Sequence, residues 1–260
     1  SVRQQPFSGV MAKQRAYSLK SSYMTQVLNK YIFGDVESER VIKAVNRLRH
    51  YSFEECVINR LVPFYGKTVS QLRQMCNIMS TAKNVNELIL AKMLGVEGKI
   101  AQTEEFKKAS IIPKTIRVQK NGKIKENMSF PTFDFIELSK EDCWEESKFY
   151  NYLAPTKFLF VIFQEQNNGE YIFEKAMFWN IPNEDLEQVR TVWERTVKTI
   201  RNGVKLIQTS RGVSNNLPKQ TENPVAHVRP HGRDGNDRLP LPDGRMMTKQ
   251  CFWLNNTYIE

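Results

Sequence analysis

The sequence lacks the features that mark membrane-spanning, secreted and zinc-binding proteins. No apolar run is long enough to cross a bilayer, and the N-terminus lacks the hydrophobic segment of a signal peptide. The four cysteines lie far apart and form no C-x-x-C pair, so neither a zinc ribbon nor a disulfide framework is predicted. Internal repeats and low-complexity tracts are missing as well. We therefore expect a cytoplasmic protein with reduced thiols and no membrane partner.

Acidic residues are the minority among the charged side chains. The 260 residues include 38 Lys and Arg against 28 Asp and Glu, which gives a formal net charge of +10 and a pI near 9.4. Such an excess is typical of proteins that bind a polyanion, although a basic protein without such a partner has the same composition. Apolar residues make up 40% and aromatic residues 11%, too much for a disordered basic tail. The charge is therefore expected on the surface of a folded domain.

The first hundred residues have the apolar spacing and the start and stop signals of helices. The predicted helices span 35–51, 52–62, 68–78 and 84–95. An apolar stripe on the first of them consists of Val36, Ile42, Val45 and Leu48. Ser52 with Glu55 predicts a capping box for the second helix, and Thr68 predicts the cap of the third.

From Ala109 onward the pattern changes to that of a sheet. Two extended runs within 109–135 flank an Asn-Gly hairpin signal at 121–122. The other predicted elements are a buried central strand at 157–164, its neighbour at 171–180, a helix at 183–203 and a short strand at 204–209. We therefore predict an α/β fold in which helices flank a mixed sheet.

The last fifty residues combine Pro, Gly and Asn with scattered arginines and lysines. Long loops of this composition are usually functional or disordered, and only 252–259 has the pattern of a helix start. Without a clear linker, we predict a single domain over 1–260, with a basic loop region near its end. Because the chain begins without methionine and stops at this helix start, we expect a fragment of a longer protein.

One segment, 104–124, resembles the metal-binding strand of a nuclease with one part missing. A Mg²⁺-dependent nuclease needs two or more carboxylates and a lysine, usually as acid-x-Lys on one strand with a second acid upstream. Glu105 and Lys114 fit two of these positions, but Ile112 stands where the second carboxylate is needed. Pro113 also removes a backbone donor from what is expected to be an inner strand. The alternative is that Glu105 and Lys114 are a solvated surface pair.

Other polar clusters give weaker signals for catalysis. Asp134 and Glu137 lie close together and provide, with Glu105 and Lys114, the residues of an alternative active site, although a strand end running into a loop fits their spacing better. His227 and His231 are four residues apart, a spacing that suits a metal pair only on a helix. Pro230 between them disfavours a helix, so we predict phosphate or base contacts here and no metal site. Trp144 is interpreted as a packing residue.

The basic loop region gives the stronger functional signal. Arginine on bent backbone pairs bidentately with guanine, and lysine suits phosphate. The predicted DNA-binding residues are Lys219, Arg229, His231, Arg233, Arg245, Lys249 and Trp253. The alternative is a run of solvated charges.

Eight segments then occur in an order found in one nuclease family. They are GKTVSQL, KNVNELILAKMLG, EEFKKASIIPKTIRV, CWEESKF, TKFLFVIF, DLEQVRTVWERTVKTI, HVRPHGRD and PDGRMMTKQCFWLNN. From about residue 66 to the end, the chain resembles the MutH mismatch-repair nuclease and its bacterial relatives among type II restriction endonucleases that recognise GATC. Among these are the Sau-type enzymes, which carry two such domains. The resemblance implies a PD-(D/E)xK core with two lobes around a DNA cleft.

The family's catalytic residues are incomplete in this sequence. Carried onto this chain, the catalytic Asp becomes Glu105, the Glu becomes Ile112, the Lys remains Lys114, and a helix Glu falls on Ala91. The family's DNA-reading Arg-Pro-Lys segment is matched by residues 229–231, and its later aromatic residue by Trp253.

The resemblance therefore implies a domain that reads DNA without cutting it. We expect a catalytically silent C-terminal domain that binds GATC in double-stranded DNA and promotes cleavage by a catalytic domain of the same chain. It would need no cofactor itself, whereas the catalytic domain would use Mg²⁺, and Lys114 would be left to contact a phosphate. The alternatives are an active Mg²⁺-dependent GATC nuclease and a basic scaffold that forms a homodimer.

Overall fold

The computed structural model describes residues 2–5, 8–13, 18–34, 38–43, 45–80, 84–210 and 212–260. The helices are α1 (Ser21–Tyr31), α2 (Phe53–Leu61), α3 (Val69–Met75), α4 (Val85–Met93), α5 (Glu104–Ala109), α6 (Phe135–Ser139), α7 (Lys148–Leu153), α8 (Asn183–Arg201) and α9 (Asn256–Ile259). The strands are β1 (Val2–Gln5), β2 (Ser8–Lys13), β3 (Ile111–Val118), β4 (Met128–Phe133), β5 (Lys157–Glu165), β6 (Tyr171–Trp179), β7 (Leu206–Thr209), β8 (Gly212–Asn215), β9 (Ala226–Pro230), β10 (Arg238–Pro240), β11 (Met246–Thr248) and β12 (Gln250–Leu254). The 3₁₀ turns are Val45–Arg49, Val62–Phe64, Ile100–Gln102, Trp144–Glu146 and Gln220–Glu222.

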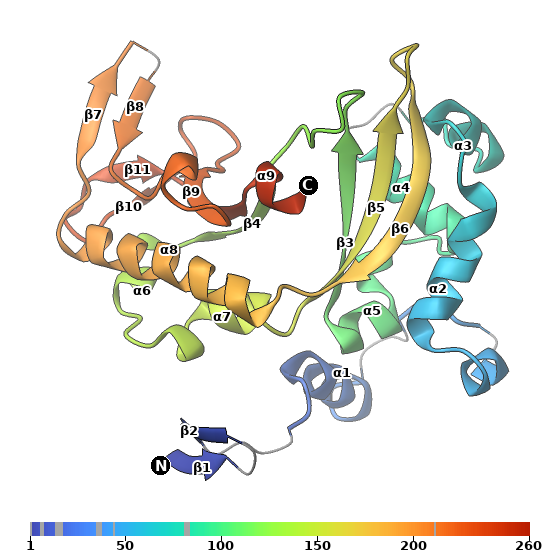
Figure 1. The fold of residues 1–260 in the computed structure, drawn as a ribbon, viewed down its shortest axis with the longest axis horizontal. Coiled ribbons are helices and arrows are strands. Elements are labelled where there is room, and N and C mark those ends of the chain that lie inside the picture. Colours follow the sequence, from blue (N-terminus) through green and yellow to red (C-terminus); the bar gives the residue numbers. More distant parts are fainter. Residues whose placement is uncertain are drawn as a thin grey trace.

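A mixed sheet of β3, β5 and β6 carries the first part of the fold (Figure 1). β5 lies in the middle, parallel to β3 and antiparallel to β6. Its sequence is apolar on both faces because both are covered: Leu159 and Val161 pack with α2, α4 and α5, whereas Phe158 and Phe160 belong to a second core. The predicted central strand, its neighbour and the mixed α/β fold class are thereby confirmed.

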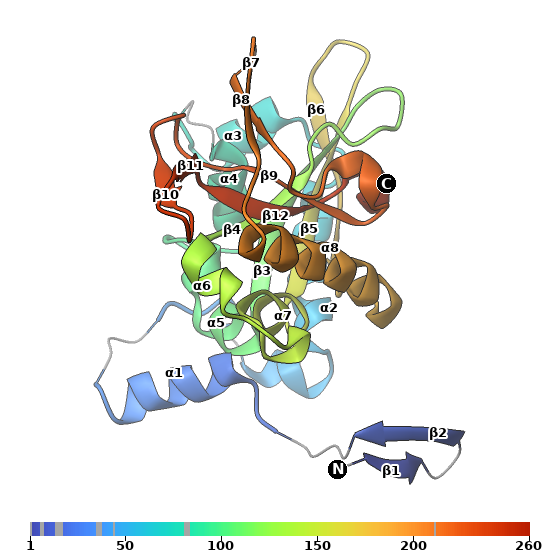
Figure 2. The ribbon, with the colours of Figure 1, turned by 90° about the vertical axis from the view of Figure 1, so that its left-hand side faces the viewer.

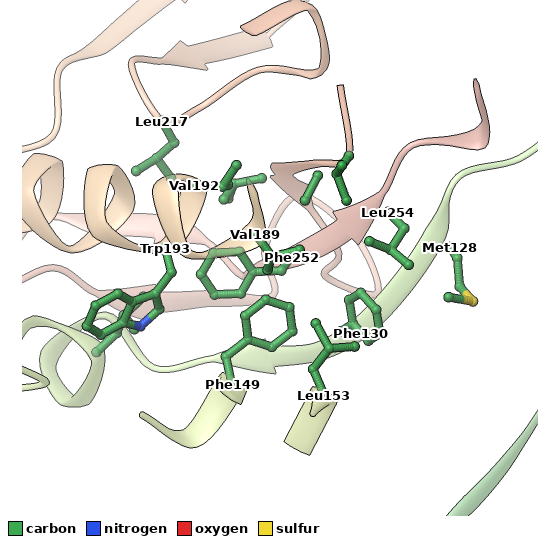
Figure 3. Close-up of a cluster of buried hydrophobic side chains, with 14 of the residues drawn as sticks. Met128, Phe130, Phe149, Leu153, Val189, Val192, Trp193, Leu217, Phe252 and Leu254 are labelled. Carbon is green, nitrogen blue, oxygen red and sulfur yellow. The ribbon is translucent and has the colours of Figure 1, made fainter. Parts of the chain in front are cut away.

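The second core lies between α8 and an antiparallel sheet in the order β4-β12-β9. Figure 3 shows Val189, Val192 and Trp193 of α8 in this core, which also contains Phe149 and Phe252. The rings of Phe149 and Phe252 are stacked, with centroids 4.2 Å apart and planes 9° from parallel. β12 is thus held from below by aromatic packing.

Three connections extend to the same side of the molecule. In the views of Figures 1 and 2, the β7–β8 hairpin, the β3–β4 loop and the β5–β6 turn all rise at the top, whereas α1, α6 and α7 lie lower. The β3–β4 loop links the two sheets, since β3 belongs to the first and β4 to the second.

The local signals in the sequence placed the starts of α2, α3, α4 and α8 correctly, whereas α1, α5 and α7 were not predicted. Ser52 and Glu55 form a reciprocal capping box, and Thr68 forms another with Gln71. The helix predicted at 183–203 is α8, and the strand predicted at 204–209 contains β7. Trp144 is buried at 3% exposure, as a packing residue should be.

The helix predicted at 35–51 is wrong. Residues 45–49 form one 3₁₀ turn, and Ser38 to Lys43 are not helical; Val36 lies outside the described residues. The backbone N–H groups of Val41 and Ile42 donate to the carboxylate of Glu105. A tertiary contact therefore takes the donors that a helix needs, and overrides the apolar periodicity.

The predicted hairpin within 109–135 is only half right. Gly122 makes the turn with φ +81°, and Val118 forms a single bridge with Ile124. The second extended run does not pair with β3, because it forms β4, which pairs with β12 in the other sheet. β3 is consequently an edge strand of the three-stranded sheet. The Ser110 carbonyl pairs with the Lys157 N–H of β5, so the even-numbered residues of β3 face β5 and the nitrogen of Pro113 faces away from it. The objection that Pro113 disrupts an inner strand was wrong.

Two segments interpreted as loops are partly regular. Residues 135–139 form α6 with Asp134 as its cap, not a strand end. The basic region after 210 contains β8 to β12, and residues 252–254 belong to β12 before α9 begins. In both places short elements depend on pairing with distant strands or on packing against α8, which local sequence does not encode.

Candidate nucleic-acid interface

The strand β3 has the side-chain alternation of a nuclease strand but lacks the carboxylate that such a strand carries. Ile112, Lys114 and Ile116 alternate on the face of β3 that is turned toward the second core, so Ile112 and Lys114 share a face as the motif requires. The Lys114 Nζ donates to the Ser129 carbonyl oxygen at 2.9 Å. Burial lowers the pKa of Lys114, as desolvation disfavours its charged form.

Glu105 serves the backbone and does not face a metal site. Its Oε2 accepts the N–H of Val41 at 3.0 Å, and its Oε1 accepts the N–H of Ile42 at 2.9 Å. Both carboxylate oxygens therefore anchor the segment that precedes α2 onto α5. The interpretation as a solvated pair with Lys114 is wrong for Glu105, whose role is structural.

The residues at the nuclease position do not fit Mg²⁺, which requires oxygen ligands. Ile112 offers a hydrocarbon side chain, and Ala91 is a buried residue of α4 at 4% exposure. Across the described parts of the chain, no group of three or more His, Cys, Asp or Glu side chains is placed to hold a metal ion.

The carboxylates of the alternative site are also occupied. The Asp134 Oδ1 accepts the N–H of Glu137 at 2.9 Å as the cap of α6. The Glu137 carboxylate pairs with Lys148 at 3.2 Å and with Lys140 at 3.7 Å. Both acids line a cavity that Lys114 does not line.

A polar face opens on the other side of the second sheet. Phe252 and Leu254 of β12 point into the core, so Cys251 and Trp253 point to the opposite face. The register places Arg229 opposite Cys251, and His227 opposite Trp253. One face of β9 and β12 therefore gathers residues that the sequence analysis had assigned to DNA binding.

Trp253 is the centre of this cluster. The Arg229 guanidinium lies 5.4 Å from the Trp253 ring centroid, within range of a cation–π contact. The His231 ring meets Trp253 edge to face at 5.1 Å, and the indole Nε1 donates to the Arg229 carbonyl oxygen at 3.3 Å. These contacts hold the Arg229 and His231 side chains, which are exposed, beside an aromatic platform.

His227 belongs to the support of this platform. It is 3% exposed, its Nδ1 lies 2.6 Å from the Asn255 Oδ1, and its ring lies nearly parallel to Trp253 at 6.4 Å. Asn255 in turn donates to the Asn223 carbonyl oxygen at 2.8 Å. A phosphate or base contact predicted for His227 is therefore wrong. The sequence analysis missed the pairing with Asn255 because the two residues lie 28 positions apart.

The remaining predicted DNA-binding residues differ in availability. Arg245 is held by Asp243 at 2.6 Å and by the Val204 carbonyl oxygen, and Lys249 pairs with Asp237 at 2.7 Å. Arg233 lies 3.9 Å from the Asp234 carboxylate but its side chain is 86% exposed, and Lys219 is exposed. The structure thus brings Arg229, His231 and Trp253 together, and places Arg245 and Lys249 in ion pairs.

Comparison with known proteins identifies the family. The family model described as DNA mismatch repair enzyme MutH matches residues 94–191. The type II restriction enzyme Sau3AI of Staphylococcus aureus is 35% identical over 299 residues, an alignment that covers all of this chain and 61% of that enzyme. The chain belongs to the MutH-like restriction endonuclease family.

The match to the MutH model implies that the mixed α/β structure has the PD-(D/E)xK nuclease fold. The 94–191 match contains Glu105, Ile112 and Lys114, the residues to which the resemblance assigned the catalytic strand. Arg229 and Trp253 lie beyond it, within the part that the restriction enzyme covers. No helix among the described residues is long and apolar enough to cross a membrane.

Because His227 is buried in this MutH-like chain, we expect the free energy of unfolding to depend on pH. Burial is the main cause that lowers its pKa from 6.5, and the Arg229 charge adds to it. The unfolded chain then takes up a proton first as the pH falls, which stabilises the unfolded state. We expect the His227 contribution to stability to be present above pH 6.5 and to decrease below it, until the lowered folded pKa is reached.

Urea unfolding of the parent protein and His227→Gln at pH 7.5, 6.5 and 5.5 measures this effect. The advantage of the parent over the variant should shrink toward pH 5.5. The same change at the exposed His50 is the control, and a difference that stays constant across the three pH values would contradict the prediction.

Proposed function

We propose that this chain is a non-catalytic domain that binds GATC in double-stranded DNA and acts as an allosteric effector of a type II restriction enzyme. The observation that carries the proposal is the contrast between two sites. The catalytic positions hold Ile112 and Ala91, and the Glu105 carboxylate is engaged by the backbone, whereas the exposed Arg229 is held against the half-buried Trp253.

The cluster suits the reading of bases. An arginine supported on an aromatic ring loses less conformational freedom when it forms a bidentate contact with guanine. His231 adds a second donor beside it, and the exposed Lys219 is available for phosphates. Lys114, which still has amine hydrogens beyond its bond to Ser129, is proposed as a phosphate contact at the edge of the same region.

An effector role follows from the missing catalytic groups if the rest of the parent enzyme cuts DNA. The chain spans about 61% of the length of the restriction enzyme that it matches, so a catalytic domain in the remainder is part of the proposal. DNA bound here would promote cleavage only if it binds more tightly to the arrangement that cuts, and that coupling would act in both directions.

One preparation tests reading and cutting together. Purified protein is incubated with GATC-bearing plasmid and Mg²⁺, and its binding to duplexes with and without GATC is measured at several salt concentrations. We expect no cleavage, tighter binding to GATC, and an affinity that falls steeply with salt.

Two outcomes would contradict the proposal. Equal affinity for both duplexes would overturn sequence-specific recognition. Cleavage that Lys114→Ala abolishes would overturn the non-catalytic assignment and favour an active nuclease.

A further inference from the structure

A second group of cations lies on the β3–β4 loop (residues 119–127), outside the predicted DNA-binding set. Lys120, Lys123 and Lys125 are all exposed. The Lys120 Nζ donates to the Asn167 carbonyl oxygen at 2.8 Å, and within the described residues neither Lys123 nor Lys125 has an acidic partner. The loop's one acid, Glu126, is bound to Arg117. These lysines therefore keep their charge available, unlike Arg245 and Lys249.

The loop is ordered by contacts that leave the lysines outside. Ile124 is buried in the second core, its N–H donates to the Glu260 Oε1 at 3.0 Å, and its carbonyl accepts the Asn256 Nδ2 at 2.9 Å. Lys123 and Lys125 flank this anchor, so their side chains point away from the core. The loop needs little ordering to bind a ligand, which reduces the entropic cost of binding.

Hydrogen bonds connect this loop to the predicted DNA-binding residues. The Asn127 Nδ2 donates to the Gln220 Oε1 at 3.2 Å, and Gln220 directly follows Lys219. On the other side of Lys219, the Pro218 carbonyl accepts the N–H of Val228 at 2.9 Å, next to Arg229. These two hydrogen bonds therefore connect the strand that carries Arg229 to the segment of Lys219, and that segment to the loop that carries Lys125.

We infer that the β3–β4 loop is a phosphate-binding surface that grips the DNA backbone beside the Arg229–Trp253 cluster. Three exposed cations on an ordered loop suit a row of phosphates, and they offer no geometry that distinguishes one base from another. Figures 1 and 2 place this loop at the same upper side as the β7–β8 hairpin and the β5–β6 turn. The inference rests on the proposed function, since it assigns further contacts to the same ligand.

The test compares the parent protein with the triple variant Lys120→Gln, Lys123→Gln, Lys125→Gln. Fluorescence anisotropy gives the affinity for a GATC duplex and for a scrambled duplex at salt concentrations from about 50 to 200 mM. If all three lysines contact phosphates, the slope of log K against log salt should become less steep by about 2 to 3. The affinity should fall by at least about tenfold near physiological salt. The ratio between the two duplexes should stay unchanged, because phosphate contacts carry no sequence information.

A control variant removes the same net charge at α6, α7 and α8, where Lys140 and Lys148 pair with Glu137. Lys140, Lys148 and Lys198 are exposed lysines on or next to α6, α7 and α8, and their replacement by Gln should leave the slope within about 1 of the parent. Thermal melting confirms that both variants fold. A triple variant that keeps the parent slope and affinity overturns the inference alone, as does an equal loss in the control variant. Failure of the parent protein to prefer GATC overturns the proposed function instead.

Discussion

Replacing Arg229 with alanine is expected to remove most of the preference for GATC. The guanidinium is held over the Trp253 ring and is exposed, as a base-reading arginine requires. A bidentate contact between arginine and guanine contributes about 1 to 3 kcal/mol of discrimination, which corresponds to about 5- to 150-fold in relative affinity. Anisotropy with a GATC duplex and a scrambled duplex measures the ratio directly.

The control for this variant is Arg190→Ala. Arg190 lies on α8, where it pairs with Glu194 at 2.8 Å, and its loss removes the same charge away from the β9–β12 face. We expect the Arg190 variant to keep the parent ratio. If Arg229→Ala weakens binding to both duplexes by the same factor, Arg229 contacts phosphate and reads no base.

Trp253→Ala should reproduce part of the Arg229 loss without removing a charge. The indole carries the Arg229 side chain and meets His231, so its removal frees both side chains and raises the entropic cost of ordering them on DNA. Trp253→Phe, which keeps a ring face, should lie between the parent protein and the alanine variant in its GATC preference.

Replacing Glu105 with alanine is expected to lower stability and leave DNA binding intact. Its carboxylate accepts two backbone N–H groups, and hydrogen bonds to a charged group contribute about 1.5 to 3 kcal/mol each, so we expect a loss of about 3 to 6 kcal/mol in the free energy of unfolding. Chemical unfolding measures the loss, and affinity for the GATC duplex should stay within about twofold of the parent.

This variant separates a structural acid from a catalytic one. Glu97→Ala is the control, because its carboxylate is exposed and, among the residues that the structure describes, pairs with Lys92 alone, a surface contact that contributes about 0 to 1 kcal/mol. Unchanged stability in Glu105→Ala, together with loss of Mg²⁺-dependent cutting, would show that Glu105 is a metal ligand and that the chain is an enzyme.

Sequence signals predicted the parts of the fold that depend on local order. The capping boxes at Ser52 and Thr68, the apolar run of β5 and the charge gradient along α8 each involve residues within a few positions of one another. The helix expected at 35–51 was lost because Glu105, more than sixty positions away, binds Val41 and Ile42. β4 paired with β12 for the same kind of reason, since the partner lies more than a hundred positions further on.

The candidate site shows the same division. Residue type and order were enough to single out Ile112 as an incompatible residue, and Arg229 with Trp253 as a candidate reading pair. The burial of His227 was needed to show that it supports Trp253 and does not contact DNA. The ion pairs of Arg245 and Lys249 were needed to distinguish them from the exposed lysines of the β3–β4 loop. Side-chain partners of this kind follow from the fold and not from spacing.

The alternation along β12 has a consequence for how specificity can change. Phe252 and Leu254 fix the strand in the core, while Trp253 between them has its side chain on the outer face. Its register partner on β9 is His227, and Arg229, two residues further along β9, continues the same face. Substitutions at positions 229, 231 and 253 therefore change the surface offered to DNA with little disturbance of the packing beneath. A library randomised at these three positions is the natural starting material for selecting domains of this fold that read a different sequence.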